Sequence, residues 1–139
     1  MSEPAIGAMA SAAMTARPED LASHFVLSAE DAFPQVFATA RMVALMELAA
    51  ARILRPHLRD GEHSVGVTVD VTHSAATPEG ASVEATARYL GREGKLFLFE
   101  VVARDRGGEV GRGTHRRAIV SGERLVAGAR RRNDAGGGL

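Results

Sequence analysis

The chain has 139 residues, of which 45% are hydrophobic and 24% are charged, a composition typical of a single globular domain. Lys plus Arg equals Asp plus Glu at 17 each, so no net field favours nucleic acid or an anionic membrane. The sequence contains no cysteine, which excludes disulfides, thiolate catalysis and cysteine-ligated metals. No stretch resembles a membrane span or a signal peptide, and we expect a cytoplasmic location.

The first half of the chain predicts an arm, a strand and a helix. Residues 1–20 are rich in alanine and interrupted by two prolines, which predicts a flexible N-terminal arm. A first strand is predicted over residues 22–29. Pro34 then indicates a loop, because the residue before a proline is biased against the helical conformation. One long helix is predicted over residues 36–58, where Pro56 and the polar residues after it end the apolar run.

Four extended segments follow the helix. The clearest covers residues 64–72, in which four valines alternate with smaller or polar residues at the period of a strand. Glycine-containing turns separate the next segments and predict antiparallel hairpins over 81–91, 95–105 and 109–121. The last residues, 123–139, predict a basic, glycine-rich flexible tail, because they offer little to bury.

The order of these elements predicts the fold class. One strand, a long apolar helix and four strands joined by hairpins predict an α+β domain over residues 21–122, with an antiparallel five-stranded sheet wrapped around the helix. The helix is too apolar for the small sheet of one subunit to cover completely. We therefore expect a homodimer, which would also cover the edges of the sheet.

Glu47 is the most informative residue of the helix. It is the only charged side chain between Arg41 and Arg52, and apolar residues surround it on every side. A helix that is hydrophobic all round is normally buried, and a buried carboxylate needs hydrogen bonds, a cation or a proton. Glu47 is therefore a candidate catalytic group, although a structural ion pair to Arg41, Arg52 or Arg117 would give the same pattern.

Several separated motifs stand out along the chain: Phe33–Thr39, Met42–Glu47, Gly66, Val71–Pro78 and Gly113–Arg117. Together they resemble the fluoroacetyl-CoA thioesterase family, whose members have the hot-dog fold of acyl-CoA thioesterases. The resemblance covers about residues 22–121 and implies a thioesterase that hydrolyses a short acyl-CoA to the free acid and CoA. It implies no cofactor, since coenzyme A is part of the substrate. The aromatic residue that commonly follows the glutamate is Leu48 here, so the sequence leaves open whether the short acyl group is fluorinated, otherwise substituted or unsubstituted.

The resemblance also implies a set of site residues. The catalytic residues implied are Thr39, Glu47 and His73, and the substrate-binding residues implied are Phe33, Val36, Gly66 and Arg117. In thioester hydrolysis Glu47 could attack the carbonyl carbon to give an anhydride, or act as a general base on water. His73 could carry a proton, and the alternative is a satisfied core histidine.

The residues themselves leave further alternatives open. Thr39 could orient the reaction or simply cap the helix, which begins nearby. Eight helical positions separate Thr39 from Glu47, so about 12 Å of rise and about 80° of rotation would keep them apart. Either His73 or the thioester lies between them, or Thr39 precedes the regular helix, or a partner subunit completes the site. We expect the last of these, a site at a dimer interface. Gly66 interrupts a run of β-branched residues, which indicates either a close approach by a ligand or a bulge.

Other classes of function are disfavoured. His57 and His63 lack a recognised zinc spacing, so no metal site is expected. The aromatic content of 4% disfavours a protein that stacks nucleic-acid bases, and we expect no nucleic-acid or membrane partner. His115, beside Thr114, receives no role. The alternative to an enzyme is a non-catalytic hot-dog module that binds acyl-CoA as a sensor, and such a module would not need Thr39, Glu47 and His73 together.

Overall fold

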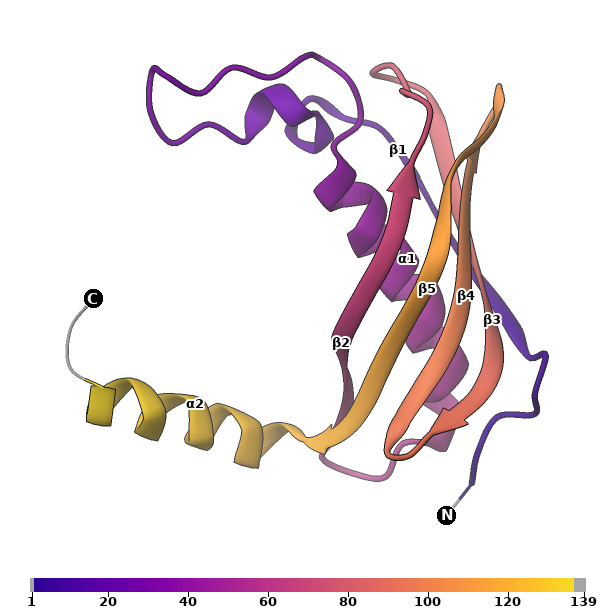
Figure 1. Cartoon of the computed structure of the whole chain (residues 1–139), viewed down its shortest axis with the longest axis vertical. Coiled ribbons are helices and arrows are strands. Elements are labelled where there is room, and N and C mark those ends of the chain that lie inside the picture. The colour runs from indigo at the N-terminus through magenta and orange to yellow at the C-terminus, as the bar shows by residue number, and fades with distance from the viewer. Residues whose placement is uncertain (1, 137–139) are drawn as a thin grey trace.

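The computed structural model describes residues 2–136. The strands are β1 (Met9–Thr15), β2 (Glu62–His73), β3 (Ser82–Glu93), β4 (Leu96–Asp105) and β5 (Gly108–Ser121), and the helices are α1 (Thr39–Leu54) and α2 (Gly122–Gly136). All strand pairs are antiparallel, and the order across the sheet is β1-β3-β4-β5-β2. The long, twisted sheet curls around α1 (Figure 1). The predicted five-stranded antiparallel sheet wrapped around one helix is confirmed.

The first strand lies earlier in the chain than predicted. Residues 22–24 form a short 3₁₀ helix, and the strand is β1, which pairs with β3 from Met9↔Arg88 to Thr15↔Ser82. The prediction that residues 1–20 are a flexible arm is therefore wrong for this segment, and the domain begins before residue 21. The sequence did not indicate strand β1 because its inward positions are mostly alanines, which have low strand propensity. They pack closely beneath α1, and Ala12 is buried there.

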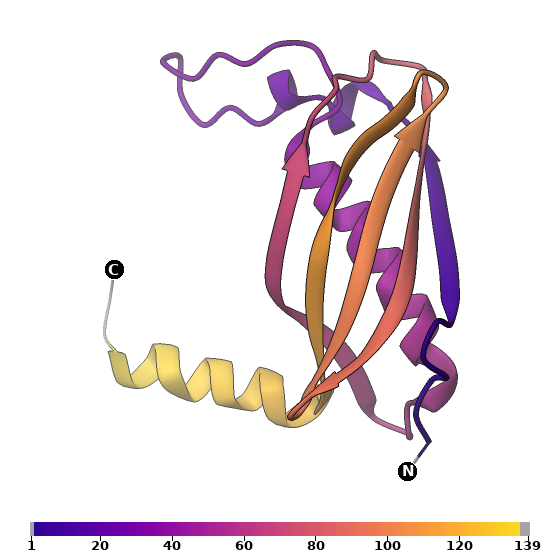
Figure 2. The ribbon, with the colours of Figure 1, turned by 45° about the vertical axis from the view of Figure 1, so that its right-hand side comes forward.

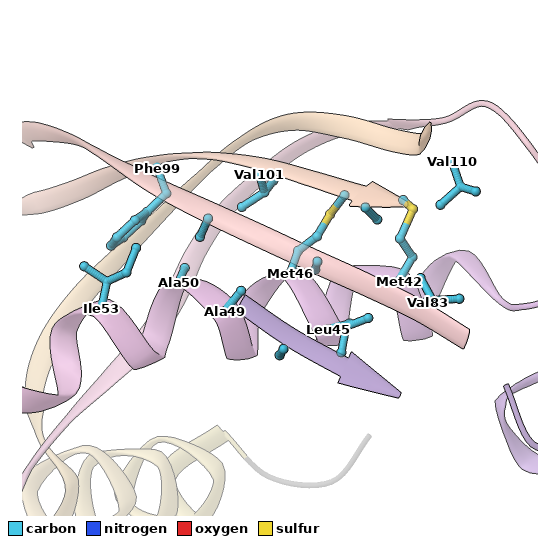
Figure 3. Packing of buried hydrophobic residues seen from close by; sticks show 14 of the residues in the cluster. Met42, Leu45, Met46, Ala49, Ala50, Ile53, Val83, Phe99, Val101 and Val110 are labelled. Carbon is cyan, nitrogen blue, oxygen red and sulfur yellow. The ribbon is translucent and has the colours of Figure 1, made fainter. Parts of the chain in front are cut away.

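One face of α1 forms the core with the sheet. Its buried side chains include Met42, Leu45, Met46, Ala49 and Ile53. Figure 3 shows these residues packed against strand side chains that include Val83, Phe99 and Val101. The helix is shorter than the predicted 36–58 at both ends. The segment before it is held extended by bridges of Phe37 to Leu21 and of Val36 to Pro78, and a 3₁₀ turn follows it at Pro56.

The opposite face of α1 is not covered. Leu48 is 52% exposed, and the side chain of Glu47 is 41% exposed. This exposure agrees with the expectation that the small sheet of one subunit cannot cover the helix completely. The exposed side adjoins β2, which lies at the edge of the sheet and pairs only with β5. Val67 and Val69 of β2 are also exposed.

Two segments extend beyond the sheet on the side of β2. Figures 1 and 2 show α2 at one end of the sheet and the loop before α1 at the other. The predicted flexible tail 123–139 is helical as far as Gly136, and its last three residues lie outside the described part of the chain. Within residues 2–136, no helix has the length and apolar character that crossing a membrane requires.

Candidate active site

Thr39 and His73 meet at the N-terminal end of α1. Thr39 is the first residue of the helix, and His73 is the last residue of β2. The Thr39 hydroxyl and His73 Nδ1 are hydrogen-bonded at 2.8 Å. The helix is capped at Ala38 without a side-chain bond, so Thr39 does not serve as the cap. His73 Nε2 is buried and has no hydrogen-bond partner in residues 2–136, so His73 is not a fully satisfied core histidine.

A cavity of about 290 Å³ opens beside this pair. Val36 lines it together with both polar residues, and the rest of the lining is mostly small or apolar: Ala22, Pro34, Phe37, Ser74, Ala75 and Ala76. Phe33 lies outside this lining and is exposed on the loop. The structure therefore places Val36 with Thr39 and His73 but does not bring Phe33 to them.

Glu47 belongs to a second cluster, two turns further along α1. Its carboxylate lies over Gly66 of β2, and a Cβ atom at position 66 would overlap Glu47 Oε1. Arg117 of β5 places Nη1 at 3.9 Å from Glu47 Oε2. Of the three arginines considered as ion-pair partners, Arg117 is the one that reaches Glu47, since Arg41 pairs with Asp20 and Arg52 donates to the Ser11 carbonyl. A cavity of about 310 Å³ lies beside Glu47, Leu48 and Arg117.

The bulge, one of the two interpretations of Gly66, is present in the structure, and the close approach by a ligand stays a prediction. The pairing of β2 with β5 shifts register between Gly66 and Thr68, so a bulge lies here. Glycine also leaves room here for the Glu47 carboxylate, which approaches the backbone closely. The close approach comes from a side chain of the protein itself, which the sequence did not indicate.

His115 was given no role, yet it lies within this second cluster. It is 1% exposed, and its ring bridges the Thr68 carbonyl oxygen, at 2.8 Å from Nδ1, and Arg117 Nη1, at 3.1 Å from Nε2. Burial, and to a smaller extent the Arg117 charge, lower the pKa of His115. Burial also lowers the pKa of the Arg117 guanidinium, against the opposing effect of Glu47. Strand alternation could have placed His115 in this cluster from the sequence, because it puts residues 115 and 117 on the same face of the strand.

The two clusters do not meet within one chain. Thr39 and His73 share a hydrogen bond, whereas Glu47 contacts Gly66 and Arg117. Thr39 and Glu47 both lie in the regular helix α1, so about 12 Å of helix rise separates them. A carboxylate, a histidine and a hydroxyl are groups that can attack a carbonyl carbon, carry a proton and donate a hydrogen bond.

Residues 16–123 match the fluoroacetyl-CoA-specific thioesterase family. The fluoroacetyl-CoA thioesterase of Streptantibioticus cattleyicolor is 45% identical over 104 residues, which is 75% of each chain. The chain belongs to this family.

Solved structures agree with this membership. A structure of the family's fluoroacetyl-CoA thioesterase superposes with a TM-score of 0.89 at 36% identity, covering 95% of this chain and 99% of that one. A variant of that enzyme in complex with acetyl-CoA has a TM-score of 0.87 at 38% identity, covering 93% and 98%. As a member of this fluoroacetyl-CoA-specific thioesterase family, the chain is a thioester hydrolase with the hot-dog fold.

Proposed function

We propose that this thioesterase hydrolyses a short acyl-CoA to the free acid and CoA, at a site that two protomers complete. The observation that carries the proposal is the division of the site residues. The Thr39–His73 pair lies in one cluster, and the exposed Glu47 carboxylate lies in another. Each cluster holds part of what thioester hydrolysis requires.

The proposed chemistry uses groups of the protein and water, without a cofactor. Glu47 attacks the thioester carbonyl carbon, or removes a proton from the water that attacks it. The Thr39 hydroxyl and the positive N-terminal end of α1 support the negative charge that develops on the carbonyl oxygen. The C–S bond then breaks, and His73 donates a proton to the leaving thiolate. The water consumed in the hydrolysis replaces that proton, directly or by way of Glu47. If Glu47 is the nucleophile, a second step hydrolyses the anhydride with water.

A homodimer would cover the exposed apolar surface. Leu48 of α1 and Val67 and Val69 of β2 form an exposed apolar area beside an unpaired sheet edge. The loop before α1 and helix α2 flank this side of the sheet (Figure 2). In a two-fold dimer whose antiparallel α1 helices cross near residue 43, midway between 39 and 47, the start of one helix would lie beside the third turn of the other. Thr39 and His73 would then face Glu47 of the partner subunit.

The cavity beside Thr39 and His73 supports a short acyl group as the substrate. Its volume of about 290 Å³ and its alanine-rich lining suit a short acyl group. The Streptantibioticus relative is a fluoroacetyl-CoA thioesterase, and the structure of a related variant contains acetyl-CoA. We propose the same substrate class here, with fluoroacetyl-CoA as one member to be tested. The cytoplasmic location stays a prediction.

Thiol release from a panel of acyl-CoAs tests the substrate class. The panel contains fluoroacetyl-, acetyl-, propionyl-, butyryl-, phenylacetyl- and hydroxybenzoyl-CoA, and we expect turnover of the short members. Glu47→Gln should abolish turnover and keep the near-UV circular dichroism of the wild type. A folded protein that binds acyl-CoA for hours without releasing thiol would instead indicate the non-catalytic binding module.

Mixed dimers test whether two protomers share the site. Thr39→Ala and Glu47→Gln are each expected to be inactive, and unfolding and refolding them together should restore about a quarter of wild-type activity. The reason is that half of the dimers are mixed and each mixed dimer has one intact site. Thr39→Ala with His73→Ala is the matched control, and this pair should restore nothing because both residues come from the same protomer. No recovery in the first mixture would place the whole site in one chain.

A further inference from the structure

His115 of β5 is buried, with β2 and β4 as its neighbouring strands and the other residues of the Glu47 cluster beside it. It lies opposite Val69 of β2 and Phe99 of β4 in the sheet, and its ring packs 6.4 Å from the Phe99 ring, between centroids. Its Nδ1 is 2.8 Å from the Thr68 carbonyl oxygen, next to the bulge at Gly66. Bulges re-aim backbone and side-chain groups, and they are frequent beside active sites.

The hydrogen bonds assign the protons of the ring. An arginine guanidinium has donors and no acceptor, so Arg117 Nη1 must donate to His115 Nε2 over 3.1 Å. Nε2 therefore carries no proton. Nδ1 carries it instead and donates to the Thr68 carbonyl oxygen. The ring is neutral and held in one tautomer, and neither nitrogen is free to exchange a proton with a substrate.

This arrangement fixes the guanidinium of Arg117. Its Nε donates to Ser64 Oγ over 3.0 Å and its Nη2 to the Ser64 carbonyl oxygen over 2.8 Å. His115 accepts from Nη1, which is the nitrogen that faces Glu47. Two strands thus hold the guanidinium on three sides, and the separation of 3.9 Å leaves the Glu47 carboxylate without a hydrogen bond to it. The charge of Arg117 is fixed near Glu47, while the carboxylate oxygens remain able to react.

We propose that His115 is a positioning residue, which in its neutral Nδ1–H form holds the Arg117 guanidinium beside the reacting carboxylate of Glu47. The inference rests on the proposed role of Glu47 in thioester hydrolysis. The hydrogen bonds that His115 makes within residues 2–136 go to Thr68 and Arg117, and none goes to Glu47. His115 acts through Arg117, because losing the acceptor would leave a buried N–H without a partner and free the guanidinium to move.

The tautomer can be measured without any turnover. Long-range ¹H–¹⁵N correlation of histidine-labelled protein should show His115 with a protonated Nδ1 and an unprotonated Nε2 near neutral pH. Replacing Arg117 with Met should shift the Nε2 resonance strongly. A protonated Nε2 would overturn the proposal, since that nitrogen could not then accept from Arg117. If the tautomer is as expected and no acyl-CoA is hydrolysed, the proposed function fails and the role of His115 as the acceptor for Arg117 stands.

Kinetics distinguish positioning from a merely structural role. His115→Phe keeps a ring in the cavity and removes the acceptor, and should lower kcat about 10- to 100-fold with little change in KM, the size expected for a hydrogen bond to a charged group. His115→Gln offers an amide oxygen to Arg117 and should recover much of kcat. Val101→Ala, which removes part of a buried side chain on β4, is the control for lost stability and should keep kcat.

A double-mutant cycle supplies the decisive comparison. In an Arg117→Met background, His115→Phe should change kcat no further, because its effect passes through Arg117. Independent, multiplying effects of the two substitutions would overturn the proposal. So would a His115→Phe protein with wild-type kcat. If His115→Phe does not fold, the tautomer measurement on the wild type and the kcat of His115→Gln decide the matter.

Discussion

Substitution of Gly66 with alanine should separate activity from stability. The added Cβ would overlap Glu47 Oε1 and come within 3.3 Å of His115 Cε1, so one of these side chains must move. His115 is buried and held by two hydrogen bonds, whereas the Glu47 side chain is 41% exposed. The carboxylate is therefore the group that moves, by about 1 Å, into open space beside the helix.

The expected size of the effect follows from that displacement. A misplacement of about 1 Å can lower the rate of a catalytic step about 10²-fold, so we expect a loss of that order in kcat. The free energy of unfolding should stay the same or rise by up to about 1 kcal/mol, because alanine restricts the unfolded chain more than glycine does. Gly66 does not need the left-handed conformation, which makes this gain available.

The assay is thiol release at saturating acyl-CoA, together with thermal unfolding followed by circular dichroism. Gly128→Ala is a matched control, since its Cβ would meet only the end of the Arg131 side chain, at 3.7 Å, and it should keep wild-type kcat. Wild-type kcat in Gly66→Ala would refute the reasoning, because it would mean that Glu47 does not react from its place over Gly66. A large loss of stability would refute the reasoning as well, because it would mean that the added methyl group displaces the sheet backbone and not only the Glu47 side chain.

Three further predictions concern other residues. His73→Ala should lower kcat about 10²- to 10⁴-fold, the usual contribution of an acid–base group, with unchanged thermal unfolding as the control. Thr77→Val removes the buried hydroxyl that donates to Asp105 Oδ2 over 2.6 Å and should cost about 1–3 kcal/mol in denaturant unfolding. Burial raises the pKa of Asp20, but hydrogen bonds from Arg17 and the charges of Arg17 and Arg41 outweigh it and hold that pKa below its usual value. The stability that Asp20 contributes is therefore present above pH 3.8 and lost as the pH falls through the lower folded pKa, so Asp20→Asn should destabilise the protein at pH 7 and hardly at all in strong acid.

Periodicity in the sequence was sufficient to predict most strands of the sheet and the long helix. The strands β2 to β5 were predicted within two residues of their ends, because alternation and glycine turns mark strands and hairpins directly. β1 was missed, since its inward positions are mainly alanine and its partner β3 begins some 70 residues later. Small side chains suit a strand that packs close to a helix, but only the packed structure shows that such a helix is there.

The candidate site was also predicted only in part: its residues were named, but not the contacts between them. The family resemblance named Thr39, Glu47 and His73, and Arg117 was among the expected partners of Glu47. Sequence alone did not show that Thr39 and His73, 34 positions apart, share a hydrogen bond. Nor did it show which residue requires the glycine at position 66.

The sequence by itself determined the kinds of residue available and the order of the elements. These are local properties, which composition, periodicity and motif spacing record. The tertiary structure decided which of those residues meet: His73 with Thr39, and His115 with Arg117 beside Glu47. Such contacts depend on the register of β2 against β5 and on where α1 crosses the sheet. Those positions result from the packing of the whole core, so no short stretch of sequence carries them.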